Sequence, residues 1–127
     1  MKRIIPLFFI LTLLFPGCQK QQRGKIRFCY SYDLENTCIG ETNTFLVKSR
    51  FWVVLELNSP SPGETMKGNL YRIGENERTF ILGKEYRLEQ GEKNTADALI
   101  INQPGRFILE FTDEKGKIVA SKELEIL

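Results

Sequence analysis

The most apolar segment beyond the first 17 residues is Phe51-Trp52-Val53-Val54-Leu55-Glu56-Leu57. Successive side chains of a β-strand point to opposite faces, so Phe51 and the alternate residues after it would share one face, and Trp52 and Val54 the other. A strand that is apolar on both faces is typical of a central strand covered on both sides. Residues 58–64 then end this strand, because two prolines and a glycine cannot continue a ladder of backbone hydrogen bonds.

The same period of two recurs on either side of this segment. Upstream, Ile26, Phe28, Tyr30 and Tyr32 alternate with other residues, which predicts a strand whose aromatic face, both tyrosines included, points into the core. Residues 33–44 are expected to form a loop. Downstream, the pattern predicts strands at 69–73, 79–82, 85–88 and 97–102, one that carries Phe107, Leu109 and Phe111, and a last one at 117–127. Lys122 interrupts the apolar face of that last strand, which predicts a bulge or an edge position.

No helical period is sustained over ten residues after residue 17. Seven to nine short strands with turns about every 8–12 residues predict an all-β fold, an antiparallel sandwich or barrel.

The first 17 residues have a different character. Lys2 and Arg3 precede an almost unbroken apolar run at residues 4–15, and Gly17 precedes Cys18. A charged start, a short apolar core and a small residue at the cut site are the parts of a secretory signal. The apolar run is well short of the roughly 20 residues that span a bilayer as a helix. We therefore predict that residues 1–17 are a signal peptide that is removed.

The segment Leu14-Phe15-Pro16-Gly17-Cys18 resembles a bacterial lipobox, although Phe15 and Pro16 differ from its commonest form. The resemblance implies that Cys18 receives a lipid, which would hold the protein on a membrane of the cell envelope. Gln19, in place of the Asp that retains many lipoproteins in the inner membrane, favours the outer membrane. Residues 18–25 are then a lipidated cysteine and a polar tether. The alternatives are an ordinary secreted protein or an uncleaved anchor, with Cys18 incidental.

Charge and composition restrict the possible functions. The chain has 18 basic and 16 acidic residues, and it loses Lys2 and Arg3 with the signal peptide, so the mature chain would be neutral. A neutral chain gives no reason to expect a nucleic-acid partner. The sequence contains no histidine, which excludes Ser-His-Asp and Cys-His catalysis and His-bearing zinc sites. We expect no enzyme, no cofactor and no metal.

Cys29 and Cys38 are the cysteines that remain after Cys18. Exported proteins meet an oxidising compartment, so this pair is predicted to form a disulfide. A reactive thiol is the alternative. Two cysteines without histidine do not supply the four ligands of a zinc site.

The C-terminal half resembles the last strands of bacterial immunoglobulin-like domains. The residues that carry the resemblance are Pro104-Gly105-Arg106-Phe107-Ile108-Leu109-Glu110-Phe111, Asp113-Glu114-Lys115-Gly116-Lys117, Ile118-Val119-Ala120-Ser121 and Leu124-Glu125-Ile126. The resemblance implies an antiparallel immunoglobulin-like β-sandwich over residues 26–127, used as a binding or spacer module. Antibody-type domains bridge their two sheets with a disulfide, but no cysteine follows Cys38, so packing alone would hold the sheets together.

One loop is a candidate binding site, since sandwiches present loops at their ends. Its residues are Ser59, Pro60, Ser61, Pro62, Gly63 and Glu64. The alternative is a solvated connection between strands.

Other residues are weaker candidates. Trp52 is expected in the core rather than on a ligand platform. Glu75 and Glu77 could pair as general acid and base, but their Gly- and Asn-containing turn favours a solvated role. Asp33, Glu35 and Asn36 carry oxygens suited to calcium, without the glycine-centred spacing of a calcium loop.

These features favour a lipid-anchored, non-enzymatic binding or interaction module of the bacterial cell envelope, with a protein partner in the envelope or on a host. A first alternative is a small inhibitor of a secreted hydrolase that uses residues 59–64 as a wedge. A second is a structural spacer that binds nothing. Fold alone does not choose among them.

Overall fold

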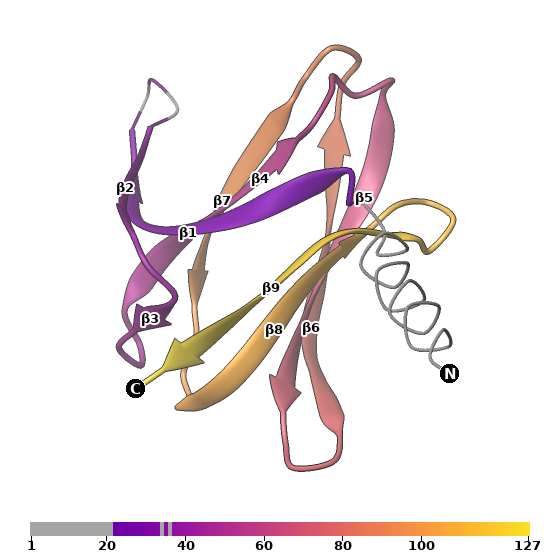
Figure 1. Cartoon of the computed structure of the whole chain (residues 1–127). Coiled ribbons are helices and arrows are strands. Elements are labelled where there is room, and N and C mark those ends of the chain that lie inside the picture. Colours follow the sequence, from indigo (N-terminus) through magenta and orange to yellow (C-terminus); the bar gives the residue numbers. More distant parts are fainter. Residues whose placement is uncertain (1–21, 34, 36) are drawn as a thin grey trace, which may run out of the picture.

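The computed structural model describes residues 22–33, 35 and 37–127, so the predicted signal peptide and Cys18 lie outside the described residues. The described chain is all-β (Figure 1). Its strands are β1 (Gly24–Tyr32), β2 (Cys38–Glu41), β3 (Thr44–Phe45), β4 (Arg50–Leu57), β5 (Glu64–Ile73), β6 (Arg78–Leu88), β7 (Asn94–Ile100), β8 (Gly105–Thr112) and β9 (Ile118–Ile126). Within this part of the chain, no helix has the length and apolar character needed to cross a membrane.

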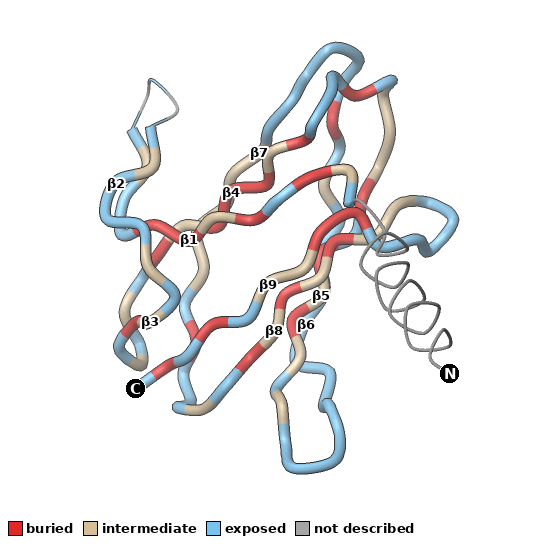
Figure 2. Tube along the Cα trace, in the orientation of Figure 1, coloured by how far each residue is buried: buried red, intermediate tan, exposed pale blue. Residues whose placement is uncertain are grey.

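The strands form two sheets that pack face to face as an open sandwich. The first sheet has the order β2-β1-β4-β7, and the second has the order β3-β9-β8-β5-β6. Every pairing is antiparallel except that of β3 with β9, which is parallel. Buried residues gather on the strands between the two layers, whereas β6 is exposed along most of its length (Figure 2).

Aromatic rings connect the two sheets in the core. Phe51 of β4 stacks on Phe45 of β3 with ring centroids 4.2 Å apart, and Phe28 of β1 meets Phe51 edge-on at 6.2 Å. All three rings are fully buried. Within the described residues no cysteine bridges the two sheets, because Cys29 and Cys38 both belong to the first sheet. The aromatic rings and the aliphatic side chains around them therefore hold the layers together, as the sequence predicted.

The prediction for β4 was half right. β4 is central in its sheet, between β1 and β7, but only one of its faces is covered by the other sheet. Trp52 lies on the uncovered face and is half-buried, so its expected core position is wrong. It packs there beside Tyr32, with centroids 5.9 Å apart, and the Arg50 guanidinium lies 5.5 Å from its ring.

The loop expected at residues 33–44 contains β2 and the start of β3. β2 pairs with the end of β1, where the chain leaves the core, and Tyr30 is therefore 55% exposed rather than buried. The Tyr30 ring lies over Gly40, which has a φ of 71°. Tyr32 is partly buried against Trp52, outside the space between the sheets. The core position predicted for the two tyrosines is wrong because the end of β1 pairs with β2 beyond the core, although the exposed Tyr30 ring still meets Phe45 of β3 edge-on, with centroids 5.0 Å apart.

β6 is one strand, although Gly83 and Lys84 were expected to separate two short ones. Gly83 lies within the ladder, where a Cβ atom would come 2.6 Å from Asn69 Oδ1 and 3.2 Å from the Phe80 ring. Glycine here allows neighbouring side chains to approach the backbone, which is one of its known uses inside strands. β5 is likewise longer than predicted, and it begins at Glu64.

The last strand contains the predicted bulge, but the bulge does not lie at Lys122. Ala120 pairs with Phe111 and Ile118 with Thr112, so Val119 is the extra residue of a bulge. As a result both Val119 and Ala120 are buried, while Ile118 faces solvent. Lys122 directs its ammonium group toward the Phe28 ring, 5.7 Å from the centroid. β9 lies between β3 and β8, so it is not an edge strand.

The predicted polar tether is shorter than residues 18–25. Gly24 and Lys25 belong to β1. Arg23 forms ion pairs with Glu64 and Asp113, and its carbonyl accepts a hydrogen bond from the Asn58 backbone at 2.7 Å. The Asn58 side chain also donates to the Gln22 carbonyl at 2.8 Å, so the described chain is fastened to the domain from Gln22 onward.

Candidate functional site

The sandwich is open on the side where β6 and β7 face each other. β6 ends the second sheet and β7 ends the first, so each strand has a neighbour on one edge only. Apolar side chains are exposed there: Ile81 at 41%, Leu82 at 39% and Ile100 at 50%. We call the surface formed by Ile81, Leu82 and Ile100 the open side.

A cavity of about 230 Å³ lies beneath the open side. Its lining residues are Leu70, Ile81, Leu82, Ile100, Ile101, Asn102, Gln103 and Phe107. Leu70 and Phe107 are fully buried and form its floor, so the cavity leads from the surface into the core. It is smaller than the roughly 300–1,000 Å³ of small-molecule pockets. Its size and apolar lining suit one or two side chains of another protein.

A polar clasp closes the other half of the gap between β6 and β7. The Asp97 carboxylate accepts hydrogen bonds from the Lys84 ammonium and the Tyr86 hydroxyl, each at 2.8 Å. All three side chains line a smaller cavity of about 120 Å³, although the long Lys84 side chain is also 59% exposed. Inward-pointing charges are one way in which edge strands avoid pairing with other chains. Lys84, Tyr86 and Asp97 therefore protect one half of the gap and leave the Ile81 half open.

Burial and hydrogen bonding shift the pKa values of Asp97 and Tyr86 in the clasp. Partial burial acts to raise the pKa of Asp97, but the hydrogen bonds from Lys84 and Tyr86 outweigh it, and the pKa lies below its usual value. Burial raises the pKa of Tyr86, and so does its hydrogen bond to Asp97. At neutral pH the Asp97 carboxyl is therefore ionised and the Tyr86 phenol is neutral.

Acidification is expected to remove the stabilisation that the clasp provides. The pKa of Asp97 is lower in the folded chain than the value of about 3.9 in an unfolded chain, so the stabilisation is present above pH 4 and is lost as pH falls through the folded pKa. Urea midpoints measured between pH 6 and pH 2 should show a gap between the wild type and Asp97→Asn that narrows with acid. The exposed Glu75→Gln variant is the control, and a gap independent of pH would contradict the assignment.

The predicted binding loop is partly built into the domain. Ser61 is 2% exposed, and its hydroxyl donates to the Leu88 carbonyl and accepts from the Gly63 backbone at 3.0 Å. Its backbone N–H and carbonyl pair with Glu92 and Gly91 of the β6–β7 loop, each at 2.8 Å. Ser59, Pro60 and Pro62 are exposed. Glu64 starts β5 and is held by Arg23. Only half of the predicted loop is therefore accessible to a partner.

Ser61→Ala is expected to destabilise the domain by about 1 kcal/mol, because the buried hydroxyl provides two hydrogen bonds that the methyl group cannot. Ser59→Ala, at an exposed position two residues earlier, should change the free energy of unfolding by less than about 0.5 kcal/mol. Chemical denaturation of both variants makes the comparison. Equal effects would show that Ser61 does not anchor the loop.

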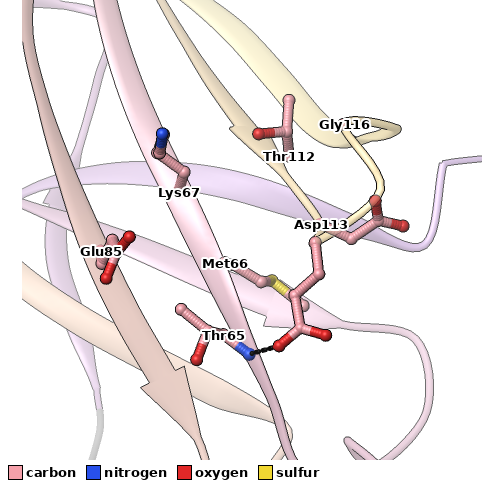
Figure 3. Close-up of a pocket in the computed structure, with 8 residues that line it drawn as sticks. Thr65, Met66, Lys67, Glu85, Thr112, Asp113 and Gly116 are labelled. Atoms are coloured by element: carbon pink, nitrogen blue, oxygen red, sulfur yellow. Dashed lines mark hydrogen bonds between the residues drawn. The ribbon is translucent and has the colours of Figure 1, made fainter.

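A broad surface hollow of about 540 Å³ lies beside the β8–β9 turn (Figure 3). The dashed line in Figure 3 is the 3.2 Å hydrogen bond from the Thr65 backbone to the Glu114 carboxylate. Asp113 accepts hydrogen bonds from the backbone of Lys117 and Lys115, both at 2.9 Å, and these lower its pKa. Both acidic groups thus stabilise the turn and the start of β5.

The remaining predicted residues lie in two separate turns. Glu75 and Glu77 are exposed in the β5–β6 turn, which is closed by a 2.7 Å hydrogen bond from the Gly74 backbone to the Glu77 carbonyl. Asp33 accepts backbone hydrogen bonds from Glu35 and Thr37, while Asn36 lies outside the described residues. In residues 22–33, 35 and 37–127 no three acidic, cysteine or histidine side chains gather as a metal site would require.

The predicted disulfide is confirmed. Cys29 and Cys38 are bonded, with Cα atoms 5.5 Å apart, and they join β1 to β2. Cys29 is fully buried.

The open side was not predicted from the sequence. Whether a strand lies at the edge of a sheet depends on the topology. The alternation of apolar and polar residues within the strand does not reveal its position in the sheet. One local signal was present: Phe80, Ile81 and Leu82 are three consecutive apolar residues in a segment that otherwise alternates.

No protein-family model matches the chain, and no curated protein is detectably similar to it. Among solved structures, the chain is similar to superoxide reductase (neelaredoxin) from Ignicoccus hospitalis, with 12% identity, a TM-score of 0.46, and coverage of 68% of this chain and 76% of that one. It is also similar to a CARDB domain from Pyrococcus furiosus, solved in complex with di-metal ions, with 12% identity, a TM-score of 0.41, and coverage of 85% and 97%. These similarities are to other β folds and assign no activity to this chain.

Proposed function

We propose that this protein is a lipid-anchored, non-enzymatic interaction module of the bacterial cell envelope, which binds a protein partner through the open side. The observation that carries the proposal is the exposure of Ile81, Leu82 and Ile100 over an apolar cavity between two unpaired strand edges. Exposed apolar surface over a cavity is typical of a site that another molecule covers.

We also propose that the fold is of the immunoglobulin type, which would account for the gap. Immunoglobulin sandwiches have strands A, B, E and D in one sheet and C, F and G in the other, with C′ added beside C in some. The orders β1-β4-β7 and β6-β5-β8-β9 correspond to A-B-E and C′-C-F-G. β2 and β3 are then additions between A and B. β6 leads to β7 through a short loop, so no strand takes the place of D, and the edge of β7 is left uncovered.

The entry point of the chain supports a defined orientation on a membrane. The Gln22 carbonyl accepts a hydrogen bond from the Asn58 side chain at 2.8 Å, so the predicted anchor joins the domain beside the β4–β5 loop. A lipid at Cys18 would place that loop toward the membrane and the β5–β6 turn away from it. The open side would then face sideways, toward neighbours held on the same membrane, where anchoring raises the effective concentration.

The mass of the protein extracted from membranes tests the anchor. We expect residues 18–127 plus lipid, and we expect the Cys18→Ala variant to lose the lipid and the membrane association. An unlipidated mass, or a chain that keeps residue 1, would exclude a lipid anchor.

Recovery of partners from detergent-solubilised envelopes tests the binding surface. Ile100→Glu places a charge on the open side, whereas Ile118→Glu changes a similarly exposed isoleucine on β9 and is the matched control. A partner recovered with the wild type should be lost with Ile100→Glu and kept with Ile118→Glu. Equal recovery with both variants, or no specific partner at all, would contradict the proposal.

A further inference from the structure

We propose that the open side binds a second copy of this chain, with the two β6 strands pairing antiparallel about a two-fold axis between Ile81 and Leu82. This inference rests on the proposed interaction function and names the partner of the same site. Such pairing requires a free strand edge, a register that both copies can adopt, and opposite charges at facing positions.

The first half of β6 offers a free edge. β6 has 11 residues and contains no proline, and its pairing with β5 leaves its other edge without a neighbour. Unpaired backbone groups on such an edge are a template for another strand. The protective charges of the clasp begin at Lys84, so residues 79–83 carry no charge to oppose pairing.

A bulge makes this edge irregular and directs its side chains. Leu70 pairs with Leu82 and Tyr71 with Phe80, so Ile81 is the extra residue. Ile81 and Leu82 consequently both line the cavity, while Phe80 turns outward and packs on Tyr71. An extra residue shifts the register against a regular strand. In a two-fold pair, however, both strands contain the same extra residue between Arg78 and Glu85. The two strands therefore have equal numbers of residues to pair, and no residue lacks a partner.

Charge and the faces on which the side chains lie both favour one register. Pairing about the axis between residues 81 and 82 places Arg78 opposite Glu85 of the second copy, and the symmetry makes this contact twice. It also places Phe80 opposite Gly83, and Ile81 opposite Leu82. Phe80, Gly83 and Glu85 line the same outer hollow, and Arg78 lies over the Tyr71 ring at 4.1 Å on that face. Lys84 reaches this hollow too, but it also lines the inner cavity and bonds Asp97 there. Residues placed opposite each other therefore share a face, as an antiparallel pair requires.

Neighbouring registers are worse. A shift of one residue in one direction brings Arg78 opposite Lys84, which places like charges together. A shift in the other direction brings outward-facing Phe80 opposite inward-facing Lys84, so the two faces no longer match. Arg78 already pairs with Glu110 at 3.0 Å, but a guanidinium has five donors and can serve a second carboxylate.

A pair of short strands buries less surface than the roughly 800 Å² per partner of a stable complex. The two-fold pair should therefore be weak for free molecules. Anchoring on one membrane raises the effective concentration and removes part of the cost of association. The experiment consequently uses the full, membrane-bound chain.

Charge reversal tests the register with two differently tagged copies expressed together and co-purified from mild detergent. Glu85→Arg places Arg opposite Arg, and Arg78→Glu places Glu opposite Glu, so we expect each variant to lose self-association by about tenfold or more. A Glu85→Arg copy mixed with an Arg78→Glu copy regains two opposite-charge contacts, and association should return to near the wild-type level. Glu89→Arg, an exposed reversal outside the pairing, is the control for charge alone.

Thermal melting of each variant separates lost association from lost folding, since Arg78→Glu also removes the contact with Glu110. Recovery in the mixed pair cannot come from unfolded chains. Unchanged association of folded Glu85→Arg, or no recovery in the mixed pair when both variants are folded, would overturn the inference. If Ile100→Glu nevertheless loses an envelope partner, the open side binds another protein, and the proposed function stands without the second copy.

Discussion

Phe51→Ala is expected to lower the free energy of unfolding by about 3–5 kcal/mol. The Phe51 ring is fully buried and lies between Phe45 of the second sheet and Phe28 of its own sheet. Its removal leaves a cavity at a contact between the two layers, which no disulfide reinforces. Since domains of this size have about 5–15 kcal/mol of stability in total, this single change would remove a large part of it.

The exposed aromatic Phe80 provides the matched control for Phe51. It is 57% exposed, and Phe80→Ala should cost less than about 1 kcal/mol because little apolar surface is returned to water. Urea denaturation monitored by Trp52 fluorescence measures both variants. A loss below about 1.5 kcal/mol for Phe51→Ala would mean that the aromatic contacts do not hold the sheets together.

Removal of the Cys29–Cys38 disulfide is expected to cost about 2–3 kcal/mol. The bond closes a short loop, with a sequence separation of 9, and cross-linking a short loop restricts the unfolded chain less than cross-linking a long one. The bond also ties β2 to β1 at a place where the chain lies outside the two-sheet core. The Cys29→Ala, Cys38→Ala double variant should lose this stability in urea.

A reductant separates the stability that comes from the disulfide bond from any effect of replacing the two cysteine side chains. Dithiothreitol should shift the urea midpoint of the wild type toward that of the double variant and leave the double variant unchanged. If the wild type does not respond although mass spectrometry shows free thiols, the disulfide contributes nothing to stability, and the expected value is wrong.

The all-β fold could be predicted because alternation is a local property. In β8 the apolar residues Phe107, Leu109 and Phe111 are buried as their period of two requires. The failures occurred where a distant contact outweighed a local preference. Gly83 stays within β6 because Asn69 and Phe80 occupy the space of its missing side chain. Trp52 looks like a core residue, yet it lies on the face that no other layer covers.

The candidate site was less predictable than the fold. Residues 59–64 had the composition of an exposed loop, but Ser61 is buried by partners 27 to 31 residues away in the sequence, Leu88 and Glu92 among them. The open side depends on which strands lie at the edges. That property comes from the order β3-β9-β8-β5-β6 and not from the composition of β6 itself.

The position of the C-terminus has a practical consequence for labelling. β9 begins beside the β8–β9 turn, where Arg23 contacts Asp113, and runs to the opposite end of the sandwich, where Leu127 pairs with Phe45 and Val47 (Figure 1). Nine extended residues measure about 30 Å. A fluorophore fused after Leu127 would therefore stand about 30 Å from the point where the chain enters the domain. With the proposed lipid anchor in place, energy transfer from that fluorophore to an acceptor dye in the bilayer would measure the tilt of the sandwich relative to the membrane.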